Sequence, residues 1–83
     1  MVEDIMIPQV GETADEEVKI IKWNKKVGDH VDKGDLILDI ETGKGTMEIE
    51  SIYEGILIEI IAGEGEIVHP LAKVGKIKIA QEQ

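Results

Sequence analysis

Lys44 is the residue of this 83-residue chain whose side chain is best placed for chemistry, because a glycine stands on each side of it. Gly43 and Gly45 leave space around the lysine ammonium, which another molecule could then reach. The alternative is a solvated lysine in an ordinary turn, since lysine is common wherever a chain meets water. The sequence on either side of Lys44 must decide between these two interpretations.

Two alternating apolar segments flank Lys44 and predict a β-hairpin with the lysine at its tip. Apolar residues alternate over 36–41 and again over 47–50, which is the period of half-buried strands. A one-residue slip between these strands would place carboxylates opposite apolar side chains, so we expect the register that avoids this. The expected pairs are Thr42 with Gly45, Ile40 with Met47, and Leu38 with Ile49.

Gly43 and Lys44 are the two central residues of the turn in this register. Glycine at the first central position favours a type II′ turn, in which that residue has a positive φ. A type I turn followed by Gly45 is the alternative. In both cases the hairpin holds Lys44 at its apex without a bulky neighbour.

The composition argues against several classes of function. The chain has no cysteine, so it offers neither disulfides nor thiolate metal ligands, and the separated His30 and His69 predict no metal site. The formal net charge of −9 argues against nucleic acid or an anionic membrane as a partner, since both attract clustered lysine and arginine. The first residues lack the features of a signal peptide, and no apolar run is long enough to cross a membrane. We therefore expect a soluble, intracellular domain.

The two halves of the sequence repeat, and the repeat predicts the fold. A shift of 37 residues aligns the halves around two Gly-acidic turns, and we expect two inserted residues later in the second half. Short strands separated by turns at this spacing are typical of an all-β sandwich or flattened barrel. We expect two sheets related by a pseudo-twofold axis. The aligned residues are Gly28-Asp29 with Gly65-Glu66, Val31 with Val68, Leu38 with Ile77, and Ile40 with Ile79.

One domain covering residues 1–83 is expected, with its core at about 3–80 and a tail at 81–83. Trp23 should be a packing residue, because it ends a predicted strand. Ten apolar side chains are expected between the sheets: Ile20, Val27, Leu36, Leu38, Ile40, Met47, Ile49, Leu57, Ile67 and Ile77.

No catalytic constellation can be assembled from the remaining residues. His30 and the His69-Pro70 pair lie at predicted turns, where histidines without a special role are common. Four glutamates could pair as catalytic carboxylates, but solvent-facing positions that make the surface around Lys44 acidic explain them better. These are Glu41, Glu48, Glu50 and Glu54.

The central motif and the repeat together resemble the lipoyl domains of the acyltransferase component of 2-oxo acid dehydrogenase complexes. The similarity covers nearly the whole chain, from Ile7-Pro8-Gln9-Val10-Gly11-Glu12 to Gly65-Glu66-Ile67-Val68. It implies an all-β flattened barrel of two four-stranded antiparallel sheets, and it implies that Lys44 carries lipoic acid in amide linkage. The surrounding residues are the expected recognition surface: Glu41, Thr42, Gly43, Gly45 and Met47.

The function implied by this resemblance is that of a monomeric, non-catalytic swinging-arm carrier. A lipoate ligase or lipoyl transferase would attach the lipoate. A thiamine diphosphate-dependent decarboxylase would load an acyl group, the acyltransferase core would pass it to coenzyme A, and dihydrolipoamide dehydrogenase would reoxidise the arm. The implied location is the cytoplasm, or the mitochondrial matrix in a eukaryote.

The chain departs from the family pattern beside the lysine. Gly43 and Gly45 stand where the family usually has aspartate and often alanine, so we expect weaker recognition by a decarboxylase. Biotinyl domains share the implied fold but place methionine on each side of the lysine, and a biotin carrier is the first alternative. An unmodified β-sandwich that binds a partner through its acidic surface is the second.

Overall fold

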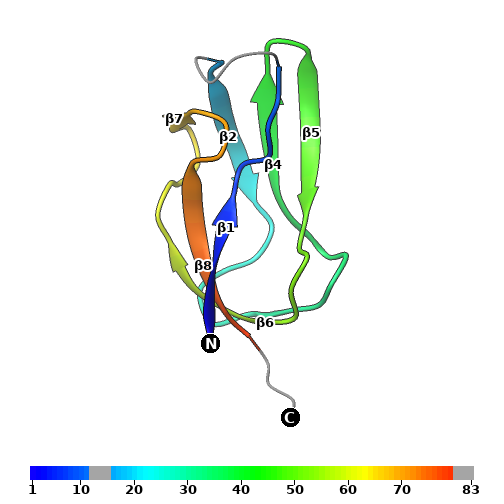
Figure 1. Ribbon diagram of the computed structural model, residues 1–83, viewed down its shortest axis with the longest axis vertical. Coiled ribbons are helices and arrows are strands. Elements are labelled where there is room, and N and C mark those ends of the chain that lie inside the picture. Colours follow the sequence, from blue (N-terminus) through cyan, green and yellow to red (C-terminus); the bar gives the residue numbers. More distant parts are fainter. Residues whose placement is uncertain (12–15, 80–83) are drawn as a thin grey trace.

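The computed structural model describes residues 1–11 and 16–79, and this part of the chain contains eight β-strands and no helix (Figure 1). Valine and isoleucine dominate the apolar positions, and glycine or aspartate interrupts them at short intervals, which favours strands over helices. The expected all-β class is confirmed. The strands are β1 (Val2–Met6), β2 (Val18–Trp23), β3 (His30–Val31), β4 (Leu36–Thr42), β5 (Gly45–Glu50), β6 (Gly55–Ile60), β7 (Ile67–Val68) and β8 (Lys73–Ile79).

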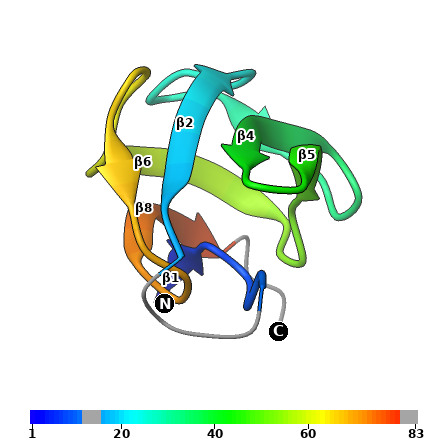
Figure 2. The same ribbon diagram turned by 90° about the horizontal axis from the view of Figure 1, so that it is seen from above.

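The strands form two four-stranded antiparallel sheets that pack against each other (Figures 1 and 2). One sheet has the order β1-β8-β6-β3 and the other has the order β5-β4-β2-β7. Each strand of one sheet has its counterpart at the same place in the other. The expected pseudo-twofold relation between two four-stranded sheets is therefore confirmed.

The repeat is more regular than the sequence suggests. Strands β2, β3 and β4 have counterparts in β6, β7 and β8 at a constant separation of 37 residues. The expected two-residue insertion in the second half is wrong, so Ile40 corresponds to Ile77 and not to Ile79. Strands β4 and β8 also share the same sequence of exposed and buried positions, which supports this alignment.

Inward-facing side chains of both sheets form the core. Of the ten residues expected there, five are buried and Ile49 packs against them partly exposed. A β-bulge between Leu36 and Leu38 interrupts the alternation of β4, so Ile37 and Leu38 are both buried and Leu36 faces outward. The expectation is wrong for four exposed residues: Val27, Leu36, Met47 and Ile67.

Trp23 is buried at the end of β2, as expected for a packing residue. Its indole N–H donates a hydrogen bond to the carbonyl of Ala62 at 2.8 Å. This bond satisfies the one polar group that the ring carries into the core. Trp23 therefore links the first half of the chain to the second.

The β4–β5 hairpin and the β1–β8 pair reach opposite ends of a domain with extents of 40 × 20 × 19 Å (Figure 1). At the second of these ends, the N–H of Ile79 donates to the carbonyl of Met1 at 2.8 Å. Residues 80–83, which include the expected tail, lie outside the described part of the chain. Within the described ranges, no helix has the length and apolar character needed to cross a membrane.

Candidate functional site

The β4–β5 hairpin presents Lys44 at one end of the domain (Figure 1). Each pair in its expected register is observed, because the alternating apolar residues find their partners only in this alignment. The hairpin belongs to a sheet whose next strand, β2, pairs with β4, so the stem is held from one side. The confirmed pairs are Thr42 with Gly45, Ile40 with Met47, and Leu38 with Ile49.

Gly45 is the residue of the turn with a positive φ, at 128°. Gly43 does not have a positive φ, so the expected type II′ turn is wrong. The alternative is a type I turn followed by Gly45. That arrangement needs a positive φ at Gly45, which is where the structure has it. Gly45 is thus needed for the backbone conformation, whereas Gly43 contributes only its small size.

Thr42 holds the turn in shape through its hydroxyl. The backbone N–H of Lys44 donates to Thr42 Oγ1 at 3.1 Å, and the hydroxyl donates to the carbonyl of Gly45 at 3.2 Å. These two bonds tie the apex to the last residue of β4. Thr42, expected as a recognition residue, therefore has a structural role in positioning Lys44.

The Lys44 side chain is exposed and has open space around it. A Cβ added at Gly43 or Gly45 would meet no heavy atom within 4 Å. Among the ion pairs formed by the described residues, none involves Lys44. Converting the ammonium into a neutral amide would therefore break no contact of the fold, and the site fits a covalently attached acyl group.

Glu41 and Met47 flank the turn on the two strands of the hairpin. Both side chains are exposed, and Glu41 pairs with Thr46 across the ladder. Met47, expected both in the core and in the recognition surface, is 41% exposed and lies outside the core. The five expected recognition residues thus surround Lys44, and their part in recognition stays a prediction.

A second segment lies beside the lysine and was missed by the sequence analysis. Gln9, Val10 and Gly11 line a hollow of about 220 Å³ together with Lys44 and its hairpin neighbours. Val10 is buried, which anchors this segment although it has no strand ladder of its own. The only sequence signal for its position was its place within the family resemblance.

The acidic surface is less concentrated around Lys44 than expected. Glu41 faces another shallow hollow together with Glu16 and Glu17 near Gly43. Glu50, however, pairs with Leu36 at the end of β5 farthest from the turn.

Glu54 lies in the connector just before β6, where it approaches a histidine. His30 Nε2 lies 3.6 Å from Glu54 Oε2 and 2.8 Å from Asp32 Oδ1. These three exposed side chains could together ligate a metal ion, a grouping that the sequence did not predict because His30 and Glu54 are distant along the chain. All three are exposed, and the hydrogen bond between His30 and Asp32 holds two of them together without a metal ion.

Asp35, in the turn between β3 and β4, has a lowered pKa. The backbone N–H of Asp32 donates to the carboxylate of Asp35 at 2.9 Å, and this bond is the main cause that lowers the pKa of Asp35. Lys25, with Nζ 3.3 Å from the same carboxylate, adds to the effect. The shift belongs to a turn and not to the surroundings of Lys44.

Comparisons with known proteins agree with this geometry. The family model described as "Biotin-requiring enzyme", the biotin/lipoyl model, matches residues 3–77. The chain is 36% identical to the lipoyl domain of the 2-oxoglutarate dehydrogenase complex from Azotobacter vinelandii, solved in solution. The TM-score is 0.73, and the match covers 90% of this chain and 94% of that domain.

Curated relatives are longer proteins of one type. The chain is 35% identical over 79 residues to the dihydrolipoyllysine-residue succinyltransferase component of the 2-oxoglutarate dehydrogenase complex of Haemophilus influenzae, covering 95% of this chain and 19% of that protein. It is 41% identical over 78 residues to the dihydrolipoyllysine-residue acetyltransferase component of the acetoin cleaving system of Bacillus subtilis, covering 94% and 19%. The chain therefore spans about a fifth of the length of these relatives.

The family model matches most of the chain, and the similar solved domain is matched over nearly its full length. The fold, the hairpin and the exposed lysine at its apex are consistent with both matches. The chain belongs to the biotin/lipoyl attachment family and, within it, to the lipoyl domains of dihydrolipoyllysine acyltransferase components.

Proposed function

We propose that Lys44 carries a lipoyl group in amide linkage and that the domain serves as the swinging-arm carrier of a 2-oxo acid dehydrogenase complex. One observation carries the assignment to this residue: Lys44 stands at the exposed apex of the hairpin, between two glycines, with its backbone N–H held by Thr42. When bound, lipoate supplies a dithiolane that can accept an acyl group together with two electrons. The domain itself is a non-catalytic part of a transferase component.

The contribution of the protein is to present this group and to stay chemically inert around it. The paired strands fix the position of the Lys44 backbone, while the long side chain remains free to move between enzymes. Tethering keeps an attached intermediate at a high effective concentration near each active site. No cysteine occurs in the chain, so no thiolate of this domain can attack a disulfide on the arm.

Three enzymes are the proposed partners of the loaded arm: a thiamine diphosphate-dependent decarboxylase, the acyltransferase core and dihydrolipoamide dehydrogenase. Support comes from the curated relatives, which are components of such complexes. Before that, a lipoate ligase or lipoyl transferase would recognise the hairpin and attach lipoate to Lys44. The domain is proposed to act as a monomer within the larger assembly.

Labelling with two ligases tests the proposed function. The purified domain is incubated with lipoate and a lipoate ligase, or with biotin and a biotin ligase, and its intact mass is measured. We expect a lipoyl adduct on the wild type, no adduct on Lys44→Arg, and no biotin adduct on either. A biotin adduct in place of the lipoyl adduct would support the biotin-carrier alternative and contradict the proposal.

A further inference from the structure

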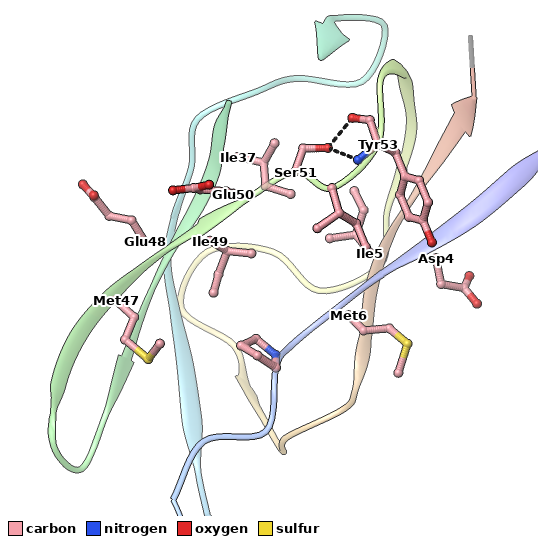
Figure 3. A pocket seen from close by; sticks show the side chains of 12 residues that line it. Asp4, Ile5, Met6, Ile37, Met47, Glu48, Ile49, Glu50, Ser51 and Tyr53 are labelled. Carbon is pink, nitrogen blue, oxygen red and sulfur yellow. Dashed lines mark hydrogen bonds between the residues drawn. The ribbon is translucent and has the colours of Figure 1, made fainter. Parts of the chain in front are cut away.

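An apolar groove runs between the edge strands of the two sheets and has no assigned occupant (Figure 3). Its volume is about 500 Å³, which lies within the roughly 300–1,000 Å³ range of small-ligand sites. The lining comes from β1 and the following Pro8, from β5 and the segment after it, and from Ile37 of β4. Its main apolar residues are Ile5, Met6, Ile37, Met47, Ile49 and Tyr53.

The two ends of the groove differ. Met47 of β5 and Met6 of β1 stand on its two sides toward the hairpin, and Met6 is 43% exposed (Figure 3). At the other end, Ser51 and Tyr53 are tied together. Ser51 Oγ donates to the Tyr53 carbonyl at 2.6 Å, and the Tyr53 N–H donates to Ser51 Oγ at 3.1 Å. The Met47 end is the one nearer the hairpin, so a group attached to Lys44 would reach the groove there.

The groove continues into the hollow beside Lys44. Met47 lines both, and Pro8 of the groove is followed directly in the chain by Gln9 of the hollow. A strand advances about 3.4 Å per residue, so Met47 lies roughly 10 Å along β5 from the lysine. A lipoyl-lysine arm has about 11 bonds between Cα and the ring, and at about 1.25 Å of advance per bond it extends about 14 Å. The ring can therefore reach the Met6–Met47 entrance.

The chemistry of the groove suits the arm better than a second copy of the domain. An acylated lysine is neutral, so only methylenes, an amide and a dithiolane would enter the apolar space. The thioethers of Met6 and Met47 are soft, adaptable contacts for such a group. A second copy would bring a net charge of −9 against a rim that carries Asp4, Glu48 and Glu50.

We infer that the groove between β1 and β5 is a resting site for the lipoyl arm of Lys44, in which the dithiolane lies against Met6 and Met47 when no enzyme holds it. The inference rests on the proposed function of Lys44. Resting contact is weak and reversible, because the groove is open to solvent along one side and the arm must leave it to reach its partners. Its consequence is partial shielding of the dithiolane.

The three methionines of the chain make this inference directly testable. The protein is labelled with ¹³C at the methionine methyls, lipoylated, and checked by intact mass before its methyl spectrum is recorded. We expect the Met6 and Met47 signals to shift and the Met1 signal, from the opposite end of the domain, to stay. We also expect nuclear Overhauser contacts between the dithiolane protons and the Met6 methyl.

Protein carrying acetyl-lysine at position 44 is the matched control, because it has lost the charge but has no arm. Its Met6 signal should remain where it is in the unmodified protein. The inference is overturned if the Met6 signal is the same in the lipoyl and acetyl forms. It is also overturned if the shift depends on protein concentration, since the occupant would then be a second copy. Absence of a lipoyl adduct in the intact mass would refute the proposed function itself.

Reduction of the dithiolane gives a second readout. An arm that rests in the groove about 70–90% of the time should react with a water-soluble phosphine about three- to tenfold more slowly than free lipoamide. Met6→Gln should restore most of the free rate, whereas Val2→Gln, also an exposed apolar residue of β1 but outside the groove lining, should not. Equal rates for the wild type and free lipoamide would contradict the inference.

Discussion

The β4–β5 hairpin and the β1–β8 pair occupy equivalent places in the two sheets, but only the first carries a turn. Both pairs are antiparallel and both have a bulge at the corresponding position, between Leu36 and Leu38 in one and between Ile5 and Met6 in the other. Strand β5 follows β4 after two residues, whereas β1 and β8 are the first and last strands of the described chain. The same scaffold thus gives a loop for chemistry at one end, and the start of β1 and the end of β8 at the other.

The surfaces of these equivalent strands differ in charge. Asp39 and Glu41 of β4 have Lys76 and Lys78 of β8 as their counterparts. These two positions are acidic in β4 and basic in β8, although the burial pattern of the two strands is the same. The comparison shows that the buried positions determine the repeated fold, while the exposed positions are free to distinguish the functional end.

The cores of the two halves also differ, and the differences complement each other. Trp23 at the end of β2 has the smaller Ile60 as its counterpart, and Leu38 has Gly75. A Cβ added at Gly75 would lie 3.0 Å from the Trp23 ring, so the large residue of one half occupies space left by the small residue of the other. Substitutions at equivalent sites should therefore have unequal effects.

The largest difference is expected between Trp23→Ala and Ile60→Ala. Removing the buried indole loses its packing and its hydrogen bond to Ala62, which should lower the free energy of unfolding by about 3–5 kcal/mol. Ile60 is only partly buried, so its truncation should cost about 1–2 kcal/mol. Denaturant unfolding of both variants measures the difference. Equal losses in the free energy of unfolding would contradict this difference between the two halves of the core.

Gly55 provides the next test, because its counterpart in the first half is Val18. A Cβ at Gly55 would collide with the carbonyl of Lys78 on the neighbouring strand β8, whereas one at Gly43 would meet nothing. We expect Gly55→Ala to destabilise the protein by about 3 kcal/mol and Gly43→Ala by less than about 0.5 kcal/mol. Thermal unfolding compares them, and a mild Gly55→Ala would mean that β6 and β8 can separate freely.

The turn that distinguishes the hairpin can be examined with its two glycines. Gly45 has a φ of 128°, which a residue with a Cβ adopts only with strain, so Gly45→Ala should cost about 1–2 kcal/mol. Gly43→Asp, which restores the residue usual in the family, should leave stability nearly unchanged. Amide hydrogen exchange of Lys44 and Thr46 should rise only in the first variant. If exchange rose in Gly43→Asp instead, the residue that needs a positive φ would be Gly43 and not Gly45.

The smallest effect concerns the equivalent turns at 32–35 and 69–72. Both contain the same backbone hydrogen bond, from Asp35 to Asp32 and from Ala72 to His69, but only the first has a carboxylate that accepts from the turn. The pKa of Asp35 is lowered in the folded state, so its carboxylate stabilises the fold above its usual pKa of 3.8. This contribution is lost as the pH falls through the lower folded pKa.

Asp35→Asn should therefore be less stable than the wild type at neutral pH, and the two should converge when the pH falls well below 3.8. Urea unfolding at a series of pH values measures this convergence. Glu3→Gln is the control, since Glu3 takes part in none of the ion pairs among the described residues. A stability gap that stays constant with pH would contradict the assigned role of the Asp35 carboxylate.

Much of the fold could be predicted from the sequence because period-2 alternation and turn residues act locally. The register around Ile40 and Met47 followed from a simple contrast between apolar and acidic partners. The bulges could not be predicted in this way, since they are set by how the two sheets curve around each other, and Leu36 was therefore placed in the core wrongly. The conformations of Gly43 and Gly45 were also ambiguous, because either glycine can adopt a positive φ.

The candidate site was predictable at its centre and less so at its periphery. Lys44 could be singled out from the repeat and the family resemblance, which both place it at the middle of the chain. The segment Gln9–Gly11 and the groove reaching Met6 depend on contacts between residues more than 30 positions apart, and no local pattern reports them.

Peptide mapping after lipoylation tests whether Lys44 is the attachment site because it lies at the hairpin apex. The wild-type domain is treated with a lipoate ligase and lipoate, digested, and analysed for modification at each of its nine lysines. We expect a lipoyl group on Lys44 and on no other lysine. An adduct on Lys76 or any other lysine, or an unmodified Lys44 in a folded protein, would contradict it.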